Sequence, residues 1–370
     1  MNKFMEEALE LARRGVGRVS PNPAVGAVIV RDDDVVGRGF YTAAGVNHAE
    51  VLALLEAGEL ARGATMYVTL EPHGFQGRTP PCTDAIIAAG IKKVVAAMED
   101  PNPRVSGKGF AQLVDAGVEV EIDSLYTHRA AQMNEAFLHF MRTGLPLVTV
   151  KAAVTLDGKI AAPEDNEGWI TSDTARAHVQ KLRHHSDAIL TGIGTVLADD
   201  CRLTDRSGLE RARPLLRIVL DSQLRLPPES RMAAGCERDL MVVTTSAGSA
   251  ERRRRLEAKG VRVEVLEDAD GRASLRAITE LLAREKYLSL MIEAGSKVNW
   301  SVLESNVADK IFFYYAPKIL GGMQSLPVAG GAGRRRRADA IRFRNVMVHP
   351  ITATEFAVEA FLEKDVYRNH

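Results

Sequence analysis

The sequence is poor in cysteine, carries no excess charge of either sign and has no long apolar run. Its 370 residues include only three cysteines, Cys82, Cys201 and Cys236, and this odd, sparse set argues against a disulfide framework. Lys plus Arg and Asp plus Glu both number 48, so no global field gathers nucleic acid or an anionic membrane surface. The arginine runs 252–255 and 334–337 lack interleaved aromatic residues, and we expect them to be solvated surface. A small-molecule partner is therefore expected.

Signals for targeting or membrane insertion are also missing. Residues 1–15 mix acidic with apolar residues and do not show the basic-then-apolar order of a secretory signal peptide. No later apolar run approaches the roughly 20 residues that a membrane-spanning helix needs. From these absences we expect a cytoplasmic protein that does not bind membranes.

The apolar residues that the chain does contain alternate between two periodicities. In the first part, helical spacing at 4–14, 48–63 and 80–90 alternates with strand-like runs at 25–30, 35–41, 65–70 and 92–98, and a further helix is expected near 135–142. This alternation predicts a layered α/β unit whose sheet is largely parallel beyond the first hairpin. The segment TGLP at 143–146 interrupts the pattern. We place a domain boundary near Gly144 and expect domains of 1–144 and 145–370.

The second part of the chain alternates in the same way. Helices are expected at 172–186, 249–260, 273–285 and 296–306, and strands at 187–192, 216–221, 240–245, 261–266, 288–295 and 309–318. A second α/β domain follows from this pattern, and 370 residues are enough for two ordinary domains.

A histidine, a glutamate and a cysteine occupy two predicted helix starts in the first domain. His48 and Glu50 open one helix, the strand-end motif TLEP follows at 69–72, and Cys82 opens the next helix. A zinc deaminase uses this arrangement: His and Cys hold a metal that activates water, and a Glu that is not a ligand shuttles protons. The N–H groups at a helix start favour a thiolate. His-x-Glu alone is a weak signal that surface helices also show, but the ordered combination favours a metal site.

The segments SPNPAVGAVIV, HAEVLAL, TLEP and GRTPPCTDAIIAAGI resemble the deaminase domain of the RibD family of riboflavin biosynthesis proteins. This resemblance implies a cytidine-deaminase-like, three-layer α/β fold. It also implies that His48, His73 and Cys82 bind zinc, that Glu50 is the proton shuttle and that Asn22 lines the pyrimidine site. The long gap between TLEP and PPC differs from the short P-C-x-x-C turn of deaminases that edit nucleic acid.

The chain departs from the family motif at one place in this loop. Where the family has Cys-Ser-His, this chain has His73, Gly74 and Phe75. Imidazole is an acceptable zinc ligand, so the change does not forbid zinc. Because a ligand and a neighbouring polar residue differ together, two interpretations stay open: a working zinc site with a His, His, Cys ligand set, or a site that has lost deamination.

The segments VKAAVTLDGKIA, ARAHVQKLRHHSDAILTGIGTVLADD, IEAGSKVNWSVLE and FYYAPKILGG resemble the reductase domain of the same family. The resemblance implies a dihydrofolate-reductase-like fold that binds NADPH. The residues implied to contact NADPH are Ala153, Trp169, Thr195, Asp199, Ser222, Gly295, Ser296, Lys297, Val298, Asn299, Trp300 and Ser301. Those implied to contact the substrate are Glu167, Arg183, Leu203, Arg206 and Glu293.

Several of these positions have a chemical meaning of their own. A strand that runs through Gly295 into a helix presents backbone N–H groups to a phosphate. Arginines such as Arg183 and Arg206 suit a phosphorylated substrate because guanidinium binds phosphate bidentately. Asp199 is the candidate proton handler beside the cofactor. Glu167 stands where the family has a substrate-contacting Ser, and an acid there is unfavourable for a phosphorylated ligand unless it points away or pairs with an arginine.

The sequence therefore predicts a bifunctional enzyme of riboflavin synthesis. Its first domain would deaminate 2,5-diamino-6-(5-phosphoribosylamino)pyrimidin-4-one with zinc, and its second would reduce the ribosyl chain to ribityl with NADPH. Two alternatives remain at this stage: a reductase whose deaminase domain is only a scaffold, and a non-catalytic nucleotide-binding or regulatory protein. As in the family, a homodimer or homotetramer is expected.

Overall fold

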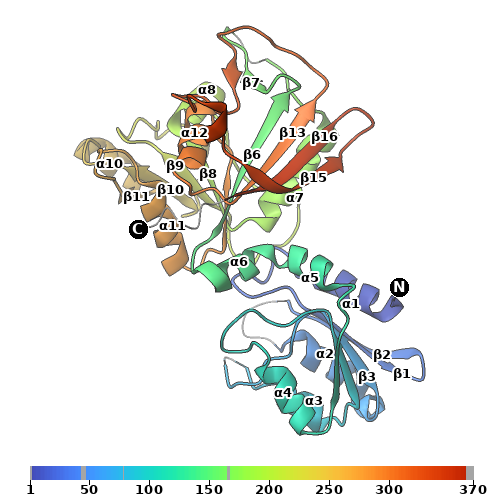
Figure 1. The fold of residues 1–370 in the computed structure, drawn as a ribbon. Coiled ribbons are helices and arrows are strands. Elements are labelled where there is room, and N and C mark those ends of the chain that lie inside the picture. The colour runs from blue at the N-terminus through green and yellow to red at the C-terminus, as the bar shows by residue number, and fades with distance from the viewer. Residues whose placement is uncertain (1, 43–46, 78, 165–166, 364–370) are drawn as a thin grey trace. The chain divides into compact units, whose positions relative to one another are not determined.

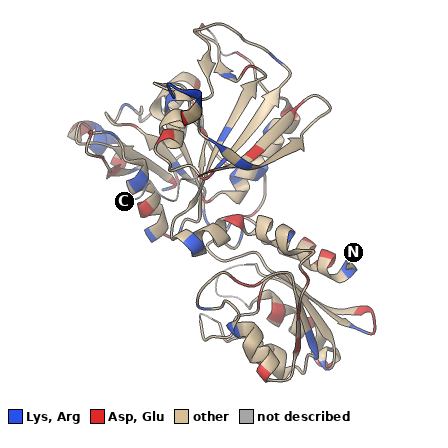
Figure 2. Cartoon of the chain, viewed as in Figure 1, with Lys and Arg blue, Asp and Glu red and all other residues tan. Residues whose placement is uncertain are grey.

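The computed structural model describes residues 2–42, 47–77, 79–164 and 167–363, and the chain forms two compact units (Figure 1). The first unit comprises Met1–Gly144 with Glu210–Arg213, and the second comprises Leu145–Leu209 with Pro214–His370. Lys and Arg are interspersed with Asp and Glu in both units (Figure 2). Within the described ranges, no helix has both the length and the apolar character that crossing a membrane requires.

The first unit is built on a five-stranded sheet in the order β2-β1-β3-β4-β5. β1 pairs antiparallel with β2 and with β3, whereas β3, β4 and β5 are parallel. The strands are β1 (Gly26–Arg31), β2 (Asp34–Phe40), β3 (Thr65–Val68), β4 (Lys93–Ala96) and β5 (Glu119–Ile122). The helices are α1 (Lys3–Arg13), α2 (Ala49–Ala57), α3 (Cys82–Ala88), α4 (Lys108–Asp115), α5 (Thr127–Met133) and α6 (Glu135–Thr143), with a 3-10 turn η1 (Gly58–Ala61).

Glycines in the first hairpin let two helices approach the sheet closely. A Cβ at Gly26 of β1 would lie 2.1 Å from the Ala8 carbonyl oxygen of α1. A Cβ at Gly39 of β2 would lie 2.0 Å from the Ala49 carbonyl oxygen of α2. Gly39 pairs with Ala27, the neighbour of Gly26, so the two glycines face opposite sides of the sheet. α1 and α2 therefore cover opposite faces, and the start of α2 is fixed against β2.

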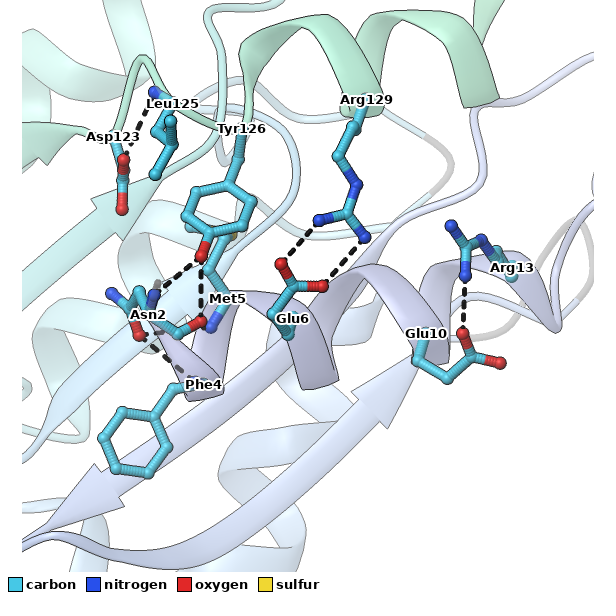
Figure 3. Close-up of polar contacts among 10 residues, drawn as sticks. All are labelled: Asn2, Phe4, Met5, Glu6, Glu10, Arg13, Asp123, Leu125, Tyr126 and Arg129. Carbon is cyan, nitrogen blue, oxygen red and sulfur yellow. Dashed lines mark hydrogen bonds and ion pairs between the residues drawn. The ribbon is translucent and has the colours of Figure 1, made fainter.

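Side-chain contacts tie α1 to α5 in the same unit (Figure 3). The backbone N–H of Asn2 donates to the Tyr126 hydroxyl at 2.6 Å, and that hydroxyl donates to the Asn2 carbonyl at 3.2 Å. The Arg129 guanidinium binds both carboxylate oxygens of Glu6 at 2.5 and 2.8 Å. Since a bidentate pair restricts both side chains, these contacts hold the N-terminal helix in place on its face of the sheet.

The second unit is built on a nine-stranded sheet in the order β11-β10-β9-β8-β12-β6-β13-β16-β15. The strands from β11 to β13 are parallel, and β16 and β15 join antiparallel at one edge. The strands of this sheet are β6 (Leu147–Thr155), β8 (Ala188–Gly192), β9 (Leu216–Leu220), β10 (Leu240–Thr244), β11 (Arg262–Val265), β12 (Ser289–Ile292), β13 (Lys310–Ala316), β15 (Phe343–Pro350) and β16 (Phe356–Leu362). The short strands β7 (Lys159–Ala161) and β14 (Leu326–Pro327) pair with each other in a separate sheet of the same unit. Its helices are α7 (Asp173–His185), α8 (Ile193–Asp199), α9 (Arg231–Ala234), α10 (Ala250–Glu257), α11 (Leu275–Arg284) and α12 (Ser296–Glu304), with a 3-10 turn η2 (Arg337–Asp339).

Two hydrophobic cores lie on opposite faces of this sheet. In β12, Leu290 and Ile292 belong to one core and Met291 to the other. In β8, Leu190 belongs to the first core and Ile189 to the second. Because alternate residues of a strand point to opposite faces, strands buried on both sides become continuous apolar runs. This burial explains why strands such as β8 and β12 were readable from the sequence.

Several elements differ from the expectation drawn from the sequence. The helix expected over 48–63 is wrong at its end, because α2 stops at Ala57 and only the short turn η1 follows. Gly58 adopts a positive φ of 53°, which glycine tolerates and which ends a helix. The elements α4, β5 and α5 were not predicted, nor were β6, β7, α8, α9, β14 and the edge hairpin β15–β16. Much of β15 is exposed, so it lacks the apolar alternation of a half-buried strand.

Candidate active sites

The side chains of His48, His73 and Cys82 converge in the first unit. One ligand atom from each lies within 4.8 Å of the others, and Cys82 Sγ is 3.4 Å from His48 Nδ1. A tetrahedral zinc ion with Zn–N of about 2.0 to 2.1 Å and Zn–S of about 2.3 Å holds two nitrogens and one sulfur roughly 3.3 to 3.6 Å apart. A small contraction of this cluster meets that geometry. The three residues therefore fit zinc, and they are the three that the sequence indicated.

Helix starts place two of these ligands and the nearby glutamate. His48 is the N-cap of α2 with an extended backbone, and Glu50 lies buried in the first turn of the same helix. Cys82 is the first residue of α3 and is also buried. The unpaired N–H groups at both helix starts favour negative charge on a thiolate or carboxylate. The local fold thus directs the proton-shuttle candidate and two ligands to one point.

Burial shifts the pKa values of the groups in this cluster toward their uncharged forms. Desolvation and the nearby His73 lower the pKa of His48 to about 4, and desolvation lowers the pKa of His73 as well. Desolvation raises the pKa of Glu50, and desolvation followed by the charge of Glu50 raises the pKa of Cys82. Neutral imidazoles are the form that binds metal, whereas the thiol must lose its proton on binding.

Asn22 connects to the cluster through an aromatic side chain. Its Nδ2 donates to the Tyr41 hydroxyl at 3.1 Å. The Tyr41 ring in turn lies edge-on to the His48 ring, with centroids 5.0 Å apart. Asn22 is therefore one side chain removed from a candidate ligand, which suits the pyrimidine-lining role implied by the resemblance.

Phe75 replaces the family's polar residue with an apolar contact. Its ring meets the His73 ring edge-on at a centroid distance of 5.4 Å. The Arg104 guanidinium carbon lies 4.3 Å from the centre of the Phe75 ring, within the range of a cation–π contact. Phe75 thus supports the His73 ring on one side and an arginine on the other.

Glu71 in the TLEP motif has a role that the sequence did not reveal. Its buried carboxylate accepts hydrogen bonds from the backbone N–H groups of Asp100, Gly107, Gly109 and Phe110, at 2.9 to 3.2 Å. Gly109 allows this approach, because a Cβ there would lie 1.9 Å from the Pro72 carbonyl oxygen. Glu71 therefore fixes the start of α4 directly beside the loop that carries His73. An acidic residue at the end of a buried strand was the available signal.

A charged trio occupies the second unit. Glu293, directly after β12, accepts from Arg183 Nε at 3.1 Å and Nη2 at 2.8 Å, and from Lys151 Nζ at 3.1 Å. The Lys151 and Arg183 side chains are only 7% and 10% exposed. Burial opposes ionisation of Glu293, but the charges of Lys151 and Arg183 outweigh it and lower its pKa to about 2. The sequence indicated Arg183 and Glu293 but missed Lys151, whose signal was a lysine within the apolar strand β6.

The ends of β8 and β12 meet at the segment implied to bind NADPH. A Cβ on Gly295 would lie 3.6 Å from Thr195 Oγ1, and one on Gly192 would lie 2.8 Å from a Val298 methyl carbon. Gly295 is the N-cap of α12, so the first N–H groups of that helix follow it. This arrangement can hold a phosphate between two parallel strands, at the carboxyl edge where ligands of such sheets bind.

Two residues of this segment make structural contacts. The Ser296 hydroxyl donates to the Pro327 carbonyl, and Asn299 Nδ2 donates to the Val328 carbonyl at 2.9 Å. Both side chains are buried. Ser296 and Asn299 therefore hold the strand β14 region against α12. Of the neighbouring positions, Lys297 and Ser301 are exposed and Trp300 is partly buried, with Arg334 over its ring at 5.5 Å.

The remaining predicted residues are spread over the second unit. Trp169 is 68% exposed, its ring 4.8 Å from the Arg176 guanidinium. The Leu203 side chain packs in the hydrophobic core, so only its backbone can face a substrate. Exposed positions include Glu167, Asp199 at the end of α8, and Arg206. Ala153 lies in β6 opposite Tyr314, and the Ser222 carbonyl after β9 accepts from the hydroxyls of Thr244 and Thr245 at 3.2 and 3.1 Å.

The arginines at 252–255 are exposed on α10, as expected for a solvated face. Arg253 and Arg255 pair with glutamates of the same helix at 2.8 and 2.6 Å. Two members of the run nevertheless border a cavity of about 240 Å³, whose lining comprises Leu224, Arg225, Leu226, Pro227, Pro228, Arg252 and Arg255. A charge run that looks generic in the sequence thus lies at a concave surface.

The sequence of the chain is similar to known protein families and to individual known proteins. Residues 146–352 match the family described as RibD C-terminal domain, and residues 1–98 match the cytidine and deoxycytidylate deaminase zinc-binding region. The riboflavin biosynthesis protein RibD of Bacillus amyloliquefaciens is 40% identical over 99% of both chains. That of Escherichia coli is 41% identical over 92% of this chain and 94% of its own.

The chain belongs to the RibD family.

Solved structures of the family agree with the fold. Acinetobacter baumannii RibD is 37% identical, covers 98% of each chain and has a TM-score of 0.85. A Thermotoga maritima diaminohydroxyphosphoribosylaminopyrimidine deaminase/5-amino-6-(5-phosphoribosylamino)uracil reductase is 35% identical, with a TM-score of 0.81 over 97% of this chain and 98% of its own. The predicted fold class is confirmed: a cytidine-deaminase-like domain precedes a dihydrofolate-reductase-like one. Membership of the RibD family favours an enzyme with both activities over the scaffold-only and non-catalytic alternatives.

Proposed function

We propose that this RibD-family protein deaminates 2,5-diamino-6-(5-phosphoribosylamino)pyrimidin-4-one in the domain 1–144 and then reduces the ribosyl chain of the product to ribityl in the domain 145–370. The observation that carries the first step is the convergence of His48, His73 and Cys82 beside the buried Glu50. The similar Thermotoga maritima protein, a diaminohydroxyphosphoribosylaminopyrimidine deaminase/5-amino-6-(5-phosphoribosylamino)uracil reductase, supports the substrate class for both steps. Homo-oligomerisation and a cytoplasmic location stay predictions.

In the deamination, His48, His73 and Cys82 would hold zinc, which when bound supplies the Lewis acidity that makes water acidic and nucleophilic. Glu50 would accept a proton from the attacking water and return it to the leaving amino group. Water is consumed, ammonia leaves, and the ring carbon that carried the amino group becomes a carbonyl carbon. Burial raises the pKa of Glu50, which makes its carboxylate a stronger proton acceptor than an exposed glutamate. Asn22, held by Tyr41, would orient the pyrimidine.

In the reduction, NADPH supplies the hydride and the protein supplies position and charge. The trio of Lys151, Arg183 and Glu293 carries two positive charges and one negative, and its net positive charge attracts the substrate phosphate. Glu293 orients both cations by its hydrogen bonds. Asp199 would orient the substrate or handle a proton at the edge of the site, where partial desolvation raises the pKa of its carboxyl.

The order of the strands suggests where the adenosine half of NADPH lies. The carboxyl ends of β12, β8, β9 and β10 are consecutive along one edge, and neighbouring strands lie about 4.8 Å apart. With the diphosphate at Gly295, β10 lies about 14 Å further along, which an extended dinucleotide can span. The cavity bordered by Arg225, Arg252 and Arg255 is formed by the segment after β9 and by α10, the helix after β10. Guanidinium groups suit the 2′-phosphate that distinguishes NADPH from NADH.

Two assays on one purified sample test this proposal. Zinc is quantified while deaminase turnover is measured with the diaminopyrimidine phosphate, and NADPH oxidation is then measured with the deaminated product. We expect about one zinc per chain, ammonia release and NADPH oxidation. Protein that cannot be loaded with zinc and does not release ammonia would contradict the first step. Ligand binding without NADPH oxidation would contradict the second.

The cofactor assignment has a separate test. Replacing Arg252 by Ala should raise the KM for NADPH by about 10-fold, the loss of one charge-assisted contact, and leave the KM for NADH unchanged. Arg254 on the same exposed helix does not border the cavity and serves as the matched control. Equal effects of Arg252→Ala on both cofactors would place the 2′-phosphate elsewhere.

A further inference from the structure

The residues that directly follow two candidate ligands are joined by one side chain. Gly74 follows His73, and Thr83 follows Cys82. Gln112, on α4, donates from Nε2 to the Gly74 carbonyl at 2.9 Å and accepts from the Thr83 hydroxyl through Oε1 at 2.9 Å. One amide therefore spans the loop that carries His73 and the helix that Cys82 begins.

The hydrogen-bond partners determine the orientation of this amide. A carbonyl oxygen only accepts, so Gly74 requires the NH₂ group of Gln112. The Thr83 hydroxyl then meets the amide oxygen, and Thr83 is fully buried, so its hydroxyl has little access to water. The backbone adds a parallel link, because the Thr83 N–H donates to the His73 carbonyl at 3.3 Å.

Gly74 is part of the same arrangement. A Cβ on Gly74 would lie 2.1 Å from Gln112 Oε1, far inside van der Waals contact. A serine at 74, as in the family motif, therefore does not fit while Gln112 holds this position. Gly74 in the loop and Gln112 on α4 are thus mutually compatible, whereas a serine at 74 is not compatible with this position of Gln112.

The position of α4 is itself fixed independently of Gln112. Glu71 accepts from the N–H groups of Gly109 and Phe110, at the start of α4, at 2.9 and 3.2 Å. Glu71 lies two residues before His73 in the sequence. Gln112 therefore extends from an anchored helix, and its two hydrogen bonds transmit that fixed position to the ligand loop.

We infer that Gln112 is a positioning residue that sets the separation of His73 and Cys82 and so adapts the RibD-family loop to a histidine ligand. The inference rests on the proposed zinc site. His73 is a larger ligand than cysteine and reaches the metal through a ring, so its backbone must be held at a defined distance from α3. Gln112 holds it by bonding to the residue after each ligand. Partners outside the ligand set typically change metal affinity by about 10- to 100-fold.

Chelator competition and cobalt spectroscopy test the inference in the full chain. Gln112→Ala should weaken zinc affinity by about 10-fold, at the low end for such partners because Gln112 acts one residue away from each ligand. The visible absorption of the cobalt-loaded variant should also shift, because the ligand geometry changes. The matched control is Asp115→Ala, an exposed residue of the same helix, which should leave both readouts unchanged.

A double-mutant cycle isolates the coupling with Gly74. Gly74→Ala should weaken zinc affinity about as much as Gln112→Ala, because the new Cβ displaces the amide. The double variant should be no worse than either single variant, since both remove the same contact. Additive losses, or a Gln112→Ala protein with wild-type affinity and cobalt spectrum, would overturn the role of Gln112 while the zinc site stands. Wild-type protein that binds neither zinc nor cobalt would overturn the zinc site and this inference together.

Discussion

The two candidate sites both desolvate titratable groups, but the groups differ in whether they stay charged. In the first unit, desolvation shifts the pKa values of the partly buried His48 and His73 and the buried Cys82 and Glu50 toward the uncharged forms. In the second unit, the partly buried Glu293 stays ionised because the charges of Lys151 and Arg183 outweigh the cost of its desolvation. The first site is therefore ready for a cation, and the second, with its net positive charge, is ready for an anion. Burial alone does not set the charge of a site; the partners do.

The largest effect is expected when the candidate proton shuttle is removed and the candidate metal ligands are left in place. Glu50→Gln should lower deaminase turnover by about 10² to 10⁴-fold, the usual contribution of a positioned acid–base group. Zinc content should stay unchanged because Glu50 is not one of the candidate ligands. NADPH-dependent reduction should stay unchanged because Glu50 belongs to the first unit and the candidate reductase residues belong to the second. Parallel assays of ammonia release, zinc and NADPH oxidation check this. Glu56→Gln, an exposed glutamate of the same helix, is the control, and loss of zinc in Glu50→Gln would contradict the assigned role.

The second-largest effect is expected when the one carboxylate of the charged trio in the second unit is removed. Glu293→Ala leaves Lys151 and Arg183 buried without their carboxylate, which should cost about 3 to 5 kcal/mol of unfolding free energy. Denaturant unfolding, followed together with NADPH oxidation, measures the loss. Glu304→Ala breaks an exposed contact with Arg334 at 3.7 Å and should cost less than about 1 kcal/mol. Similar losses in both variants would show that the trio has no special energetic role.

Low pH should decrease the free energy of unfolding of the second unit, because the Glu293 carboxylate becomes protonated. The pKa of Glu293 is about 2 in the folded protein and its ordinary value is 4.5, so the ionised form favours folding. The resulting stabilisation, roughly 3 kcal/mol, is present above pH 4.5 and is lost as the pH falls from 4.5 to 2. Unfolding measured across that range should show the loss. Glu293→Gln, which cannot ionise, should lack this component, and an unchanged pH profile in that variant would refute the assignment.

The smallest effect concerns substrate orientation in the deaminase site. Tyr41→Phe keeps the ring beside His48 but removes the hydroxyl that accepts from Asn22. Loss of one such hydrogen bond costs about 0.5 to 1.5 kcal/mol, so the deaminase KM should rise by roughly 2- to 10-fold with little change in kcat. Zinc affinity should stay constant. A large loss of zinc instead would show that Tyr41 supports the metal ligand and not the substrate side.

Much of the fold was readable because its central strands are buried on both faces. Continuous apolar runs such as those of β8, β10 and β12 were predicted within one to three residues. The elements that were missed depend on other contacts. β15 is largely exposed and exists through its pairing with β16, and α4 is held at its start by Glu71. Local periodicity does not carry such information, because the stabilising partners lie far away in the sequence.

The sequence by itself indicated the candidate zinc ligands, the candidate proton shuttle Glu50 and the family, because residue types at fixed order and spacing carry that chemistry. Only the tertiary structure decided that Lys151 joins Arg183 and Glu293, and that Gln112 bridges the residues after His73 and Cys82. These contacts join segments about 30 to more than 100 residues apart, and hydrogen bonds and desolvation act through space. Whether a buried group is charged, and how two ligands are spaced, is therefore set by folding and not by the motif.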